Sequence, residues 1–597
     1  MNNIQTFRKH FFIAVSILLL ISAGVQAETW TRRLADGVTL MQRVDDSSSP
    51  QIINIIRTDP KTPGVRIQAV LGQDTIFGKD KMKGRETVSS IAKRLNAVAA
   101  VNADFFPYTG DPLNLHISGG ELVSEPWPKR VIFGMTSDGK YLFDWLELDA
   151  KLTLANGRPY PIRGINRPRG KNEIVAYTPK FFSSTCTTGT GTEVVIKCDA
   201  LPVKVGVPVS GSIREVKPLA CDTPIPDGCL VLSGAGTGAK FIDDNIKPGD
   251  AVTIQFALKP LKTTGWDKVV EAVGGGPWLV RDGKINVDAK DEGFKPDIAV
   301  GPNPRTALGV TADGKLILAT VSGRQSISAG MTLERLAALM KSEGCVNAMN
   351  LDGGGSTTTA TSFGVLNSPS EGTERPVANA VAIFGNSLNA DGCEVRIANL
   401  SAPPCGPADP PLVQTASLSE DATADQLLAV PSGTSIQLSL VDTLGQLVSK
   451  DIADRTVWSA TGGAGFVDQS GRFYGVKARE GNIVVKLGDR TSAFQLKVVA
   501  GQPTKLTAKF ISDPSDAPNR STLAISVQDL NGNPVSGQRV VIKAVGGTSD
   551  LPEDVTGNDG KSLVGITWDD TLSGSNRVDI TCQGLKPVIV RGSSAAK

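Results

Sequence analysis

VNAMNLDGGGSTTT, residues 346 to 359, joins a short apolar strand to a run of hydroxyl side chains through three glycines. The pattern places the Asp352 carboxylate at the carboxyl end of the strand. Glycines in such a turn permit positive φ angles and let backbone N–H groups approach an anion closely. The stretch therefore predicts a polar site. A tight glycine-rich turn that Asp352 merely caps is the alternative interpretation.

Two helix–strand elements lead into polar residues of this kind. Apolar residues at i, i+3, i+4 and i+7 predict a helix over 332–342, directly before the strand that ends near Asp352. A second helix is expected over 86–95, before a strand that ends in NADFF at 102–106. The segments 130–140 and 305–315 both read as a hairpin with an Asp-Gly turn. These pairs suggest an internal duplication, two related halves around one site, with chance similarity of hairpins as the alternative.

Length and composition indicate several domains and an ordinary globular chain. The 597 residues exceed one hydrophobic core, and a net charge of +2 without charged blocks does not indicate a nucleic-acid partner. We predict a multidomain fold, an α+β unit with mixed sheets and a few helices followed by two all-β sandwiches. The expected bounds are 28–400 for the α+β unit, 401–411 for a Pro-rich linker, and 412–500 and 501–597 for the sandwiches.

The first 27 residues are typical of a cleavable signal peptide. A basic start precedes the apolar stretch Phe11–Ile21, and Val25-Gln26-Ala27 offers a small-x-small cleavage site. The apolar stretch is shorter than the roughly 20 residues that cross a bilayer, and no later stretch is apolar enough to do so. The sequence therefore predicts a periplasmic or secreted protein without a transmembrane segment after cleavage. An uncleaved membrane anchor is the alternative.

Export permits disulfides among the eight cysteines. Cysteines close in sequence bracket short loops, which predicts the pairs Cys186–Cys198, Cys221–Cys229 and Cys393–Cys405. Cys345 and Cys582 lie in apolar contexts and are expected to be buried thiols. A zinc site built from Cys and His is disfavoured, because the mature chain keeps a single histidine and has no Cys-x-x-Cys motif.

Polar clusters recur at strand ends and turns throughout residues 28–400, and their number argues for a site. They are Asn102/Asp104, Asn114/His116, Arg305/Thr306, Ser322/Gly323/Arg324, Asp352 to Thr357, and Glu374/Arg375/Pro376/Asn379. Two arginines beside glycine N–H groups would clamp an anion, because a guanidinium matches a phosphate with two hydrogen bonds. Structural ion pairs for either arginine, and a purely structural role for the histidine, are the alternatives.

Taken together, these motifs resemble those of the phosphodiester glycosidase family. The matching segments appear in the family's order and are VNADFF (101–106), GGGPWLVRDGK (274–284), PRTALGVTADGKLIL (304–318), VSGR (321–324), the stretch 330–358 and ERPVANAVAIF (374–384). The first motif departs from the family's usual glycine-containing form at Ala103 and Asp104, which leaves the role of Asp104 open. The two all-β stretches resemble bacterial immunoglobulin-like modules, the last of them the invasin type.

The resemblance implies cleavage of a sugar-1-phosphate diester at the sugar C1–O bond, which releases a free sugar and a phosphomonoester. An oxocarbenium-like sugar needs a carboxylate, for which Asp352, Asp104 and Glu374 are the candidates in that order. His116 would shuttle a proton or bind the phosphate. The residues expected to bind substrate and hold the developing charge are Asn102, Arg305, Thr306, Ser322, Arg324, Gly353, Gly354, Gly355, Ser356, Thr357 and Asn379.

This chemistry requires no cofactor, although a Ca²⁺ ion held by Asp352 and nearby carbonyl oxygens is an alternative use of the site. The expected substrate is an envelope or extracellular glycan with sugar-1-phosphate linkages, and the immunoglobulin-like modules would hold the enzyme near cell-surface glycan. A non-catalytic glycan-binding protein or adhesin is the competing function class. A factor for exopolysaccharide assembly or trimming on the same fold is the third.

Overall fold

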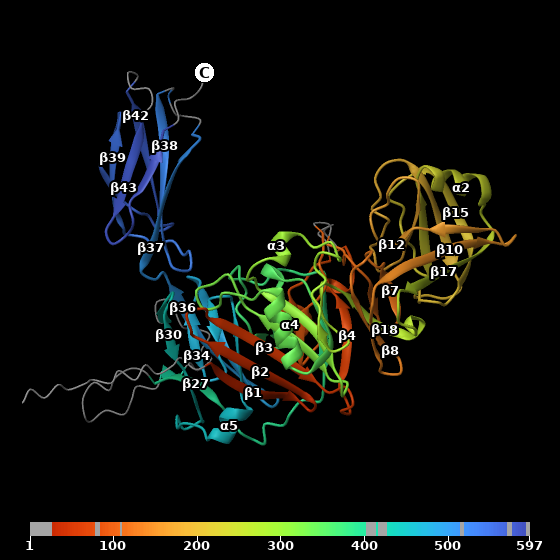
Figure 1. Cartoon of the computed structure of the whole chain (residues 1–597), viewed down its shortest axis with the longest axis horizontal. Helices are drawn as coiled ribbons and strands as arrows, with labels where there is room; N and C mark the ends of the chain where they lie inside the picture. The colour runs from red at the N-terminus through yellow and green to blue at the C-terminus, as the bar shows by residue number, and fades with distance from the viewer. Residues whose placement is uncertain are drawn as a thin grey trace, which may run out of the picture.

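The computed structural model describes residues 27–77, 84–107, 110–400, 414–415, 427–513, 517, 519–569 and 576–592. They form 44 strands and five α-helices in several sheets, so the described chain is predominantly β and multidomain (Figure 1). Residues 1–26 of the expected signal peptide and the expected linker 401–411 lie outside the described residues. None of the described helices is long and apolar enough to span a membrane.

One antiparallel sheet carries the strand that leads to Asp352. In spatial order it contains β1 (Glu28–Ala35), β2 (Val38–Asp45), β3 (Gln51–Thr58), β22 (Leu316–Val321), β21 (Arg305–Thr311), β23 (Cys345–Asn350), β19 (Trp278–Arg281) and β20 (Lys284–Ile285). One face of β21 and β22 packs on α4 (Leu333–Ser342), and the other face packs on the second central sheet. Both strands are therefore buried on both sides, which fixes the position of the turn after β23.

The second central sheet has nine strands and joins two parts of the chain. Its order is β29 (Leu428–Pro431), β36 (Arg490–Val499), β35 (Glu480–Leu487), β32 (Val457–Thr461), β25 (Gly364–Val365), β24 (Thr359–Thr361), β5 (Ala99–Asn102), β26 (Asn379–Phe384) and β4 (Arg66–Leu71). Within this sheet, the bridge between Val365 and Ala460 connects the strands of the first unit (27–400) to those of the second unit (427–500). The hydrogen-bonded sheet thus continues from one unit into the other.

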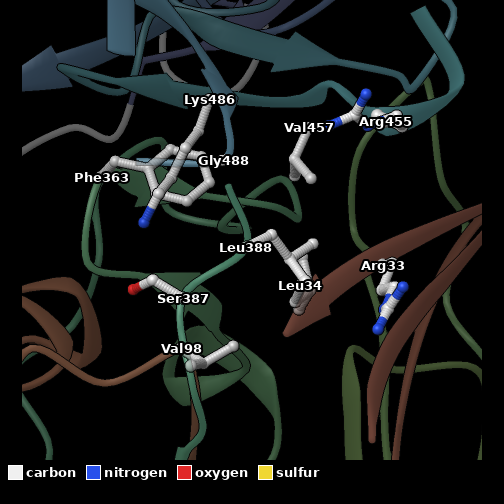
Figure 2. Close-up of a pocket in the computed structure, with 10 residues that line it drawn as sticks. All are labelled: Arg33, Leu34, Val98, Phe363, Ser387, Leu388, Arg455, Val457, Lys486 and Gly488. Atoms are coloured by element: carbon white, nitrogen blue, oxygen red, sulfur yellow. The ribbon is translucent and has the colours of Figure 1, made fainter. Parts of the chain in front are cut away.

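Side chains close the seam between these two units. Figure 2 shows Leu34 and Val98 of the first unit opposite Val457 and Lys486 of the second. The Lys486 ammonium lies 5.3 Å from the centroid of the Phe363 ring. The gap that remains has a volume of about 30 Å³, which holds no more than a few water molecules. The second unit is therefore packed tightly against the first.

The two helices expected beside the site both form. α1 (Val88–Arg94) begins after Thr87, whose side chain accepts a hydrogen bond from the Ser90 N–H, and Thr332 caps α4 in the same way. Because the threonines occupy the cap positions, α1 begins two residues, and α4 one residue, after the start of its expected range. Gly344, at φ +88°, follows the end of α4. The remaining helices are α2 (Thr237–Asn245), α3 (Pro296–Ala299) and α5 (Lys450–Arg455).

The two similar hairpins fold alike. They are formed by β8 (Ile132–Thr136) with β9 (Tyr141–Asp144), and by β21 with β22. In each turn the threonine N–H donates to the lysine carbonyl, and the threonine hydroxyl donates to the aspartate of the Asp-Gly pair. β8 and β9 belong to a five-stranded sheet with β7 (Glu121–Ser124), β6 (His116–Ser118) and β18 (Val269–Gly274).

Residues 146–260 build a separate lobe within the first unit. Its eight strands, in spatial order, are β11 (Pro159–Ile162), β10 (Leu146–Leu154), β17 (Ala251–Pro260), β15 (Val209–Ala220), β14 (Gly191–Cys198), β16 (Cys229–Gly234), β13 (Ile174–Tyr177) and β12 (Gly164–Ile165). Only β12 and β13 pair in parallel within this unit, so the mixed sheets that we expected are nearly all antiparallel. Figure 1 places the lobe and the C-terminal unit at opposite ends of the molecule.

The remaining strands complete the two C-terminal parts. In the second unit β30 (Ser435–Gln437), β34 (Arg472–Gly475) and β33 (Gly465–Val467) form one small sheet. Another small sheet joins the end of the first unit to the second, and it contains β28 (Gln414–Thr415), β27 (Arg396–Asn399) and β31 (Ser439–Val441). The C-terminal unit (501–592) has two four-stranded sheets around one core. The first sheet contains, in spatial order, β37 (Pro503–Ile511), β38 (Arg520–Asp529), β42 (Lys561–Trp568) and β40 (Gly547–Ser549). The second contains β41 (Glu553–Val555), β39 (Arg539–Val545), β43 (Arg577–Cys582) and β44 (Val588–Arg591).

The strand register contradicts two of the expected disulfides. All seven cysteines among the described residues are unpaired. Cys186 precedes β14 whereas Cys198 ends it, and Cys221 lies by the start of β14 whereas Cys229 pairs near its end. An eight-residue strand spans far more than the roughly 7 Å that a disulfide allows between Cα atoms. Both local pairs are therefore wrong for this structure, and the third includes Cys405, outside the described residues.

The same register brings other cysteines together. Cys198 lies beside Cys229, and the Cys186 N–H donates to Asp222, the residue after Cys221, over 3.2 Å. We expect the oxidised, exported chain to form Cys198–Cys229 and Cys186–Cys221. Proteolysis without reduction, followed by mass spectrometry, measures the links. Recovery of a Cys186–Cys198 peptide, or of four free alkylated thiols after export, would contradict this pairing.

Candidate active site

The turn after β23 is held between the two central sheets. The Leu351 N–H donates to the Thr306 carbonyl on β21, over 2.8 Å, and the Asp352 N–H donates to the Ala103 carbonyl beyond β5, also over 2.8 Å. The Asn102 side-chain amide donates to the Asp352 carbonyl over 2.6 Å. Polar residues that lie 250 positions apart in the chain are thereby brought to one place.

Close packing requires the glycines of this turn. Gly354 adopts φ +62° and its N–H donates to the Pro304 carbonyl over 3.0 Å. A Cβ on Gly353 would stand 2.7 Å from that same oxygen, and a Cβ on Gly355 would overlap the Arg375 guanidinium. The Gly353 N–H is a hydrogen-bond partner of the Asp352 carboxylate. Two of the three amides expected to bind an anion are thus already engaged within the protein.

Two carboxyl groups meet at the turn and differ in access. Asp352 is partly exposed, and burial raises its pKa to about 6 against the opposing effects of the Ser356 hydroxyl and the Arg375 charge. Asp104 is only 1% exposed, and burial raises its pKa to about 7. Its two carboxyl oxygens accept the N–H groups of Phe105 and Asn114 over 2.8 and 2.7 Å. Only Asp352 combines a titratable carboxyl with access to solvent.

Buried side chains hold the residues around Asp352 and Asp104 in place. Asn102 accepts hydrogen bonds from the Thr306 hydroxyl and the Thr358 N–H, over 2.8 and 3.1 Å. Asn379 accepts the Asp104 N–H over 2.8 Å, and its amide nitrogen lies 3.1 Å from His116 Nδ1. His116 is fully buried, and burial lowers its pKa to about 3, so the imidazole is neutral at physiological pH.

The two arginines of the expected anion clamp lie in different environments. Arg305 is 2% exposed, and its guanidinium donates to three backbone carbonyls, those of Met331, Ile298 and Gly301, over 2.8 to 3.2 Å. Burial lowers the pKa of Arg305 to about 10, which leaves it charged. Arg324 is exposed instead. Its Nε and Nη2 donate to Asn303 over 3.2 and 2.8 Å, and its Nη1 lies 3.3 Å from where a Gly354 Cβ would be.

Other residues expected at the site hold neighbouring loops. One Glu374 oxygen accepts the Ser89 N–H over 2.9 Å and the other accepts the Ser89 hydroxyl, so this carboxylate lies at the start of α1, and burial raises its pKa. The Ser322 hydroxyl accepts the Ser368 N–H over 3.1 Å. The Thr357 and Thr306 hydroxyls lie 3.4 Å apart. The structure thus brings Asp352, Asp104, Asn102, Asn379 and Arg324 together, and uses the others as supports.

Sequence reasoning missed an arginine beside Asp104. The positive charge of Arg130 lowers the pKa of Asp104, although burial outweighs it. The Arg130 guanidinium lies 4.3, 5.5 and 5.8 Å from the ring centroids of Phe294, Phe105 and Trp127, and Trp127 is 45% exposed. Aromatic faces of this kind bind cations and sugar rings. The available signal was the repeated hairpin, in which Arg130 occupies the position of Arg305.

Comparisons with known proteins agree with this geometry. Residues 205–384, which include Arg324, Asp352 and Asn379, match the family model of the phosphodiester glycosidases. Over this segment, which is less than a third of the chain, the protein is similar to the phosphodiester glycosidases. The segment does not include Asp104, which follows β5 and lies close enough to Asp352 for the two charges to interact. The resemblance found in the sequence motifs is thereby confirmed.

Two curated relatives are similar to parts of this chain. The "SPbeta prophage-derived uncharacterized protein YomE" of Bacillus subtilis (strain 168) is 39% identical over 108 residues, 18% of this chain and 16% of that protein. "N-acetylglucosamine-1-phosphodiester alpha-N-acetylglucosaminidase" of Mus musculus is 27% identical over 169 residues, 23% of this chain and 32% of that protein. This chain therefore spans less than a third of the length of either relative.

A solved structure is similar in fold to part of this chain. A hypothetical protein from Synechocystis superposes with a TM-score of 0.50 and 23% identity, over 60% of this chain and 64% of that one. At this level of identity the likeness concerns the fold alone.

A Ca²⁺ ion near Asp352 would share the site with two guanidinium charges. Calcium takes about six to eight oxygen ligands and favours several carboxylates. Here the charge of Arg375 acts on Asp352 and that of Arg130 acts on Asp104. In the part of the chain that the structure describes, no three His, Cys, Asp or Glu side chains are grouped so that they could hold a metal ion. The pairing of carboxylates with guanidinium groups suits a sugar phosphate better than a cation.

Proposed function

We propose that the chain hydrolyses the C1–O bond of a sugar-1-phosphodiester and releases a free sugar and a phosphomonoester. One observation carries this proposal: Asp352 is partly exposed, and the exposed guanidinium of Arg324 lies near Gly354 of the same turn. A phosphodiester glycosidase needs this combination, since positive charge forms on the sugar while negative charge collects on the leaving phosphate. The family match supports the class of reaction.

Each residue then has a defined role. Asp352 acts on the anomeric carbon, as nucleophile or as the base that activates water, because it is the partly exposed member of the Asp352–Asp104 pair, whereas Ser89 engages both oxygens of Glu374. Arg324 binds the phosphate and stabilises the charge that develops on it. Asp104 is a positioning residue, since both of its oxygens accept backbone N–H groups. Asn379 and the neutral His116 fix Asp104 in turn.

The raised pKa of Asp352 predicts an acid limit on turnover. Below about pH 6 the carboxyl is protonated and can neither attack carbon nor accept a proton. We therefore expect kcat to fall with decreasing pH, approaching about tenfold per unit well below the pKa. Steady-state rates from about pH 4 to pH 8, with circular dichroism at each pH to confirm folding, measure the profile. A kcat that stays constant down to about pH 4.5 would show that no ionised Asp352 is needed.

The reaction itself is tested with the mature protein, starting at Glu28, and a panel of sugar-1-phosphodiesters that includes UDP-N-acetylglucosamine. Hydrolysis in H₂¹⁸O distinguishes the bond that breaks. We expect the label in the free sugar, because water adds to the anomeric carbon. Label in the phosphomonoester would identify a phosphodiesterase instead. No release from any substrate, with glycan binding retained, would support the non-catalytic binding function.

We also propose that the enzyme is exported and acts on envelope or extracellular glycan. The signal-like N-terminus in the sequence supports export. The second and C-terminal units are proposed to be immunoglobulin-like modules, which is supported by the two four-stranded sheets that enclose one core in the C-terminal unit. Immunoblots of periplasm, medium and cytoplasm locate the mature protein, and a purely cytoplasmic, unprocessed chain would exclude this location.

A further inference from the structure

A pocket of about 340 Å³ opens where the three units of the chain meet. The first unit contributes Arg324, Ser326 and Ser370 to its walls, the second contributes Lys477, and the C-terminal unit contributes Leu530 and Asn531. Arg324 therefore lines this pocket and also lies near Gly354, in the turn that carries Asp352.

Hydrogen bonds between the units hold the pocket open in one shape. The Ser326 hydroxyl donates to the Asn531 side chain over 2.8 Å, and the Lys477 ammonium donates to the Asn531 carbonyl over 2.7 Å. Asn533 extends this network, because its side-chain amide donates to the Val476 carbonyl over 2.8 Å. The walls are thus fixed before a ligand arrives, which lowers the entropy that binding must overcome.

The pocket also has a definite charge. Arg324 and Lys477 both line it, and the lining residues that the structure describes include no Asp or Glu. The stem of Lys477 packs against Gly372, in the loop that carries Arg375. This contact connects the second unit to the loop of Arg375, whose positive charge acts on Asp352. Leu530, which is 62% exposed, adds an apolar surface beside these cations.

We propose that this pocket is a second anion subsite, which binds a further phosphate on the aglycone side of the scissile linkage. The inference rests on the proposed function and names its substrate class: a glycan that carries phosphate in successive repeats rather than a single terminal phosphodiester. Arg324 holds the scissile phosphate, Lys477 binds the next one, and Leu530 contacts the sugar ring between them. The second unit and the C-terminal unit then take part in substrate recognition, in addition to holding the enzyme near cell-surface glycan.

Two substrates separate the second subsite from the first. One is a sugar-1-phosphate methyl diester with a single phosphate, and the other is an oligomer of the same sugar with a second phosphodiester on the aglycone side. Lys477→Gln should raise the ratio of KM for the oligomer to KM for the methyl diester by about tenfold, since one charge-assisted hydrogen bond is lost. The matched control Lys497→Gln changes an exposed lysine on β36 of the same unit and should leave this ratio unchanged.

Lys477→Arg tests whether charge or local folding is responsible. This variant keeps the charge and should restore most of the oligomer's affinity, whereas a merely structural role would also perturb the thermal unfolding of Lys477→Gln. An unchanged KM ratio in Lys477→Gln would overturn the subsite while leaving the proposed hydrolysis intact.

Binding measured without turnover separates failure of the subsite from failure of the reaction. Calorimetry with Asp352→Asn protein and the oligomer should show tighter binding than with the methyl diester. The double variant Asp352→Asn, Lys477→Gln should lose that preference. If no diester is hydrolysed by the wild type, yet Lys477→Gln weakens oligomer binding, the reaction fails and the subsite stands. Equal binding of both ligands by Asp352→Asn protein would overturn the subsite.

Discussion

Replacement of Asp352 by asparagine is expected to lower kcat by at least about a thousandfold and to leave the fold intact. Asparagine keeps the shape of the side chain but can neither attack the anomeric carbon nor take a proton from water. The backbone of residue 352 makes the contacts that hold the turn, through its N–H to Ala103 and its carbonyl to Asn102. The fold should therefore tolerate the change. Free sugar released under saturating substrate measures kcat.

Asp199→Asn is the matched control, because Asp199 is an exposed aspartate in the separate lobe. We expect its kcat to equal that of the wild type. Thermal unfolding of both variants should coincide with that of the parent within a few degrees. A rate of Asp352→Asn within a factor of about ten of the wild type would remove Asp352 from the reaction and shift attention to Asp104.

Arg324→Gln is expected to lower kcat by about a hundredfold, because the guanidinium stabilises charge that develops on the leaving phosphate. The size of the loss should depend on the substrate. A diester whose phosphomonoester is a weaker base needs less stabilisation and should show a smaller effect. Rates for a series of diesters with graded leaving groups, measured for wild type and variant, test this relation.

The control for charge is Arg335→Gln, which removes an exposed arginine from α4. Its rates should match those of the wild type across the series. An Arg324→Gln loss that is equal for all leaving groups would indicate that the arginine only binds substrate and does not stabilise the transition state. A higher KM at unchanged kcat would lead to the same conclusion.

Local patterns were sufficient to predict the elements that carry the site. The threonine caps and apolar spacing located α1 and α4, and the Asp-Gly turns located both hairpins, because each depends on residues within a few positions of one another. Asp352 was found for the same reason. The strand, the glycines and the hydroxyl residues around Asp352 are contiguous, so a single stretch of sequence contains all of them.

Contacts between distant segments could not be predicted in this way. Arg305 and Arg324 occupy similar glycine-rich or strand-end positions in the sequence, yet three carbonyls engage the first while the second is exposed. Nothing near Glu374 indicates that Ser89 will engage both of its oxygens. The cysteine pairs failed for the same reason, since strand register, not separation along the chain, decides which residues meet.

The nine-stranded sheet contains strands from both sides of residue 400, so truncation at this residue would remove part of the sheet. Without the second unit, β25 would become a free edge, open to pairing with another chain. Arg32, which is 6% exposed, would also lose the carbonyls of Thr456 and Gln469 that accept its guanidinium N–H groups. The first and second units therefore share one sheet, and an insertion or fusion that separates them would disturb the sheet that carries Asn102 and Asn379.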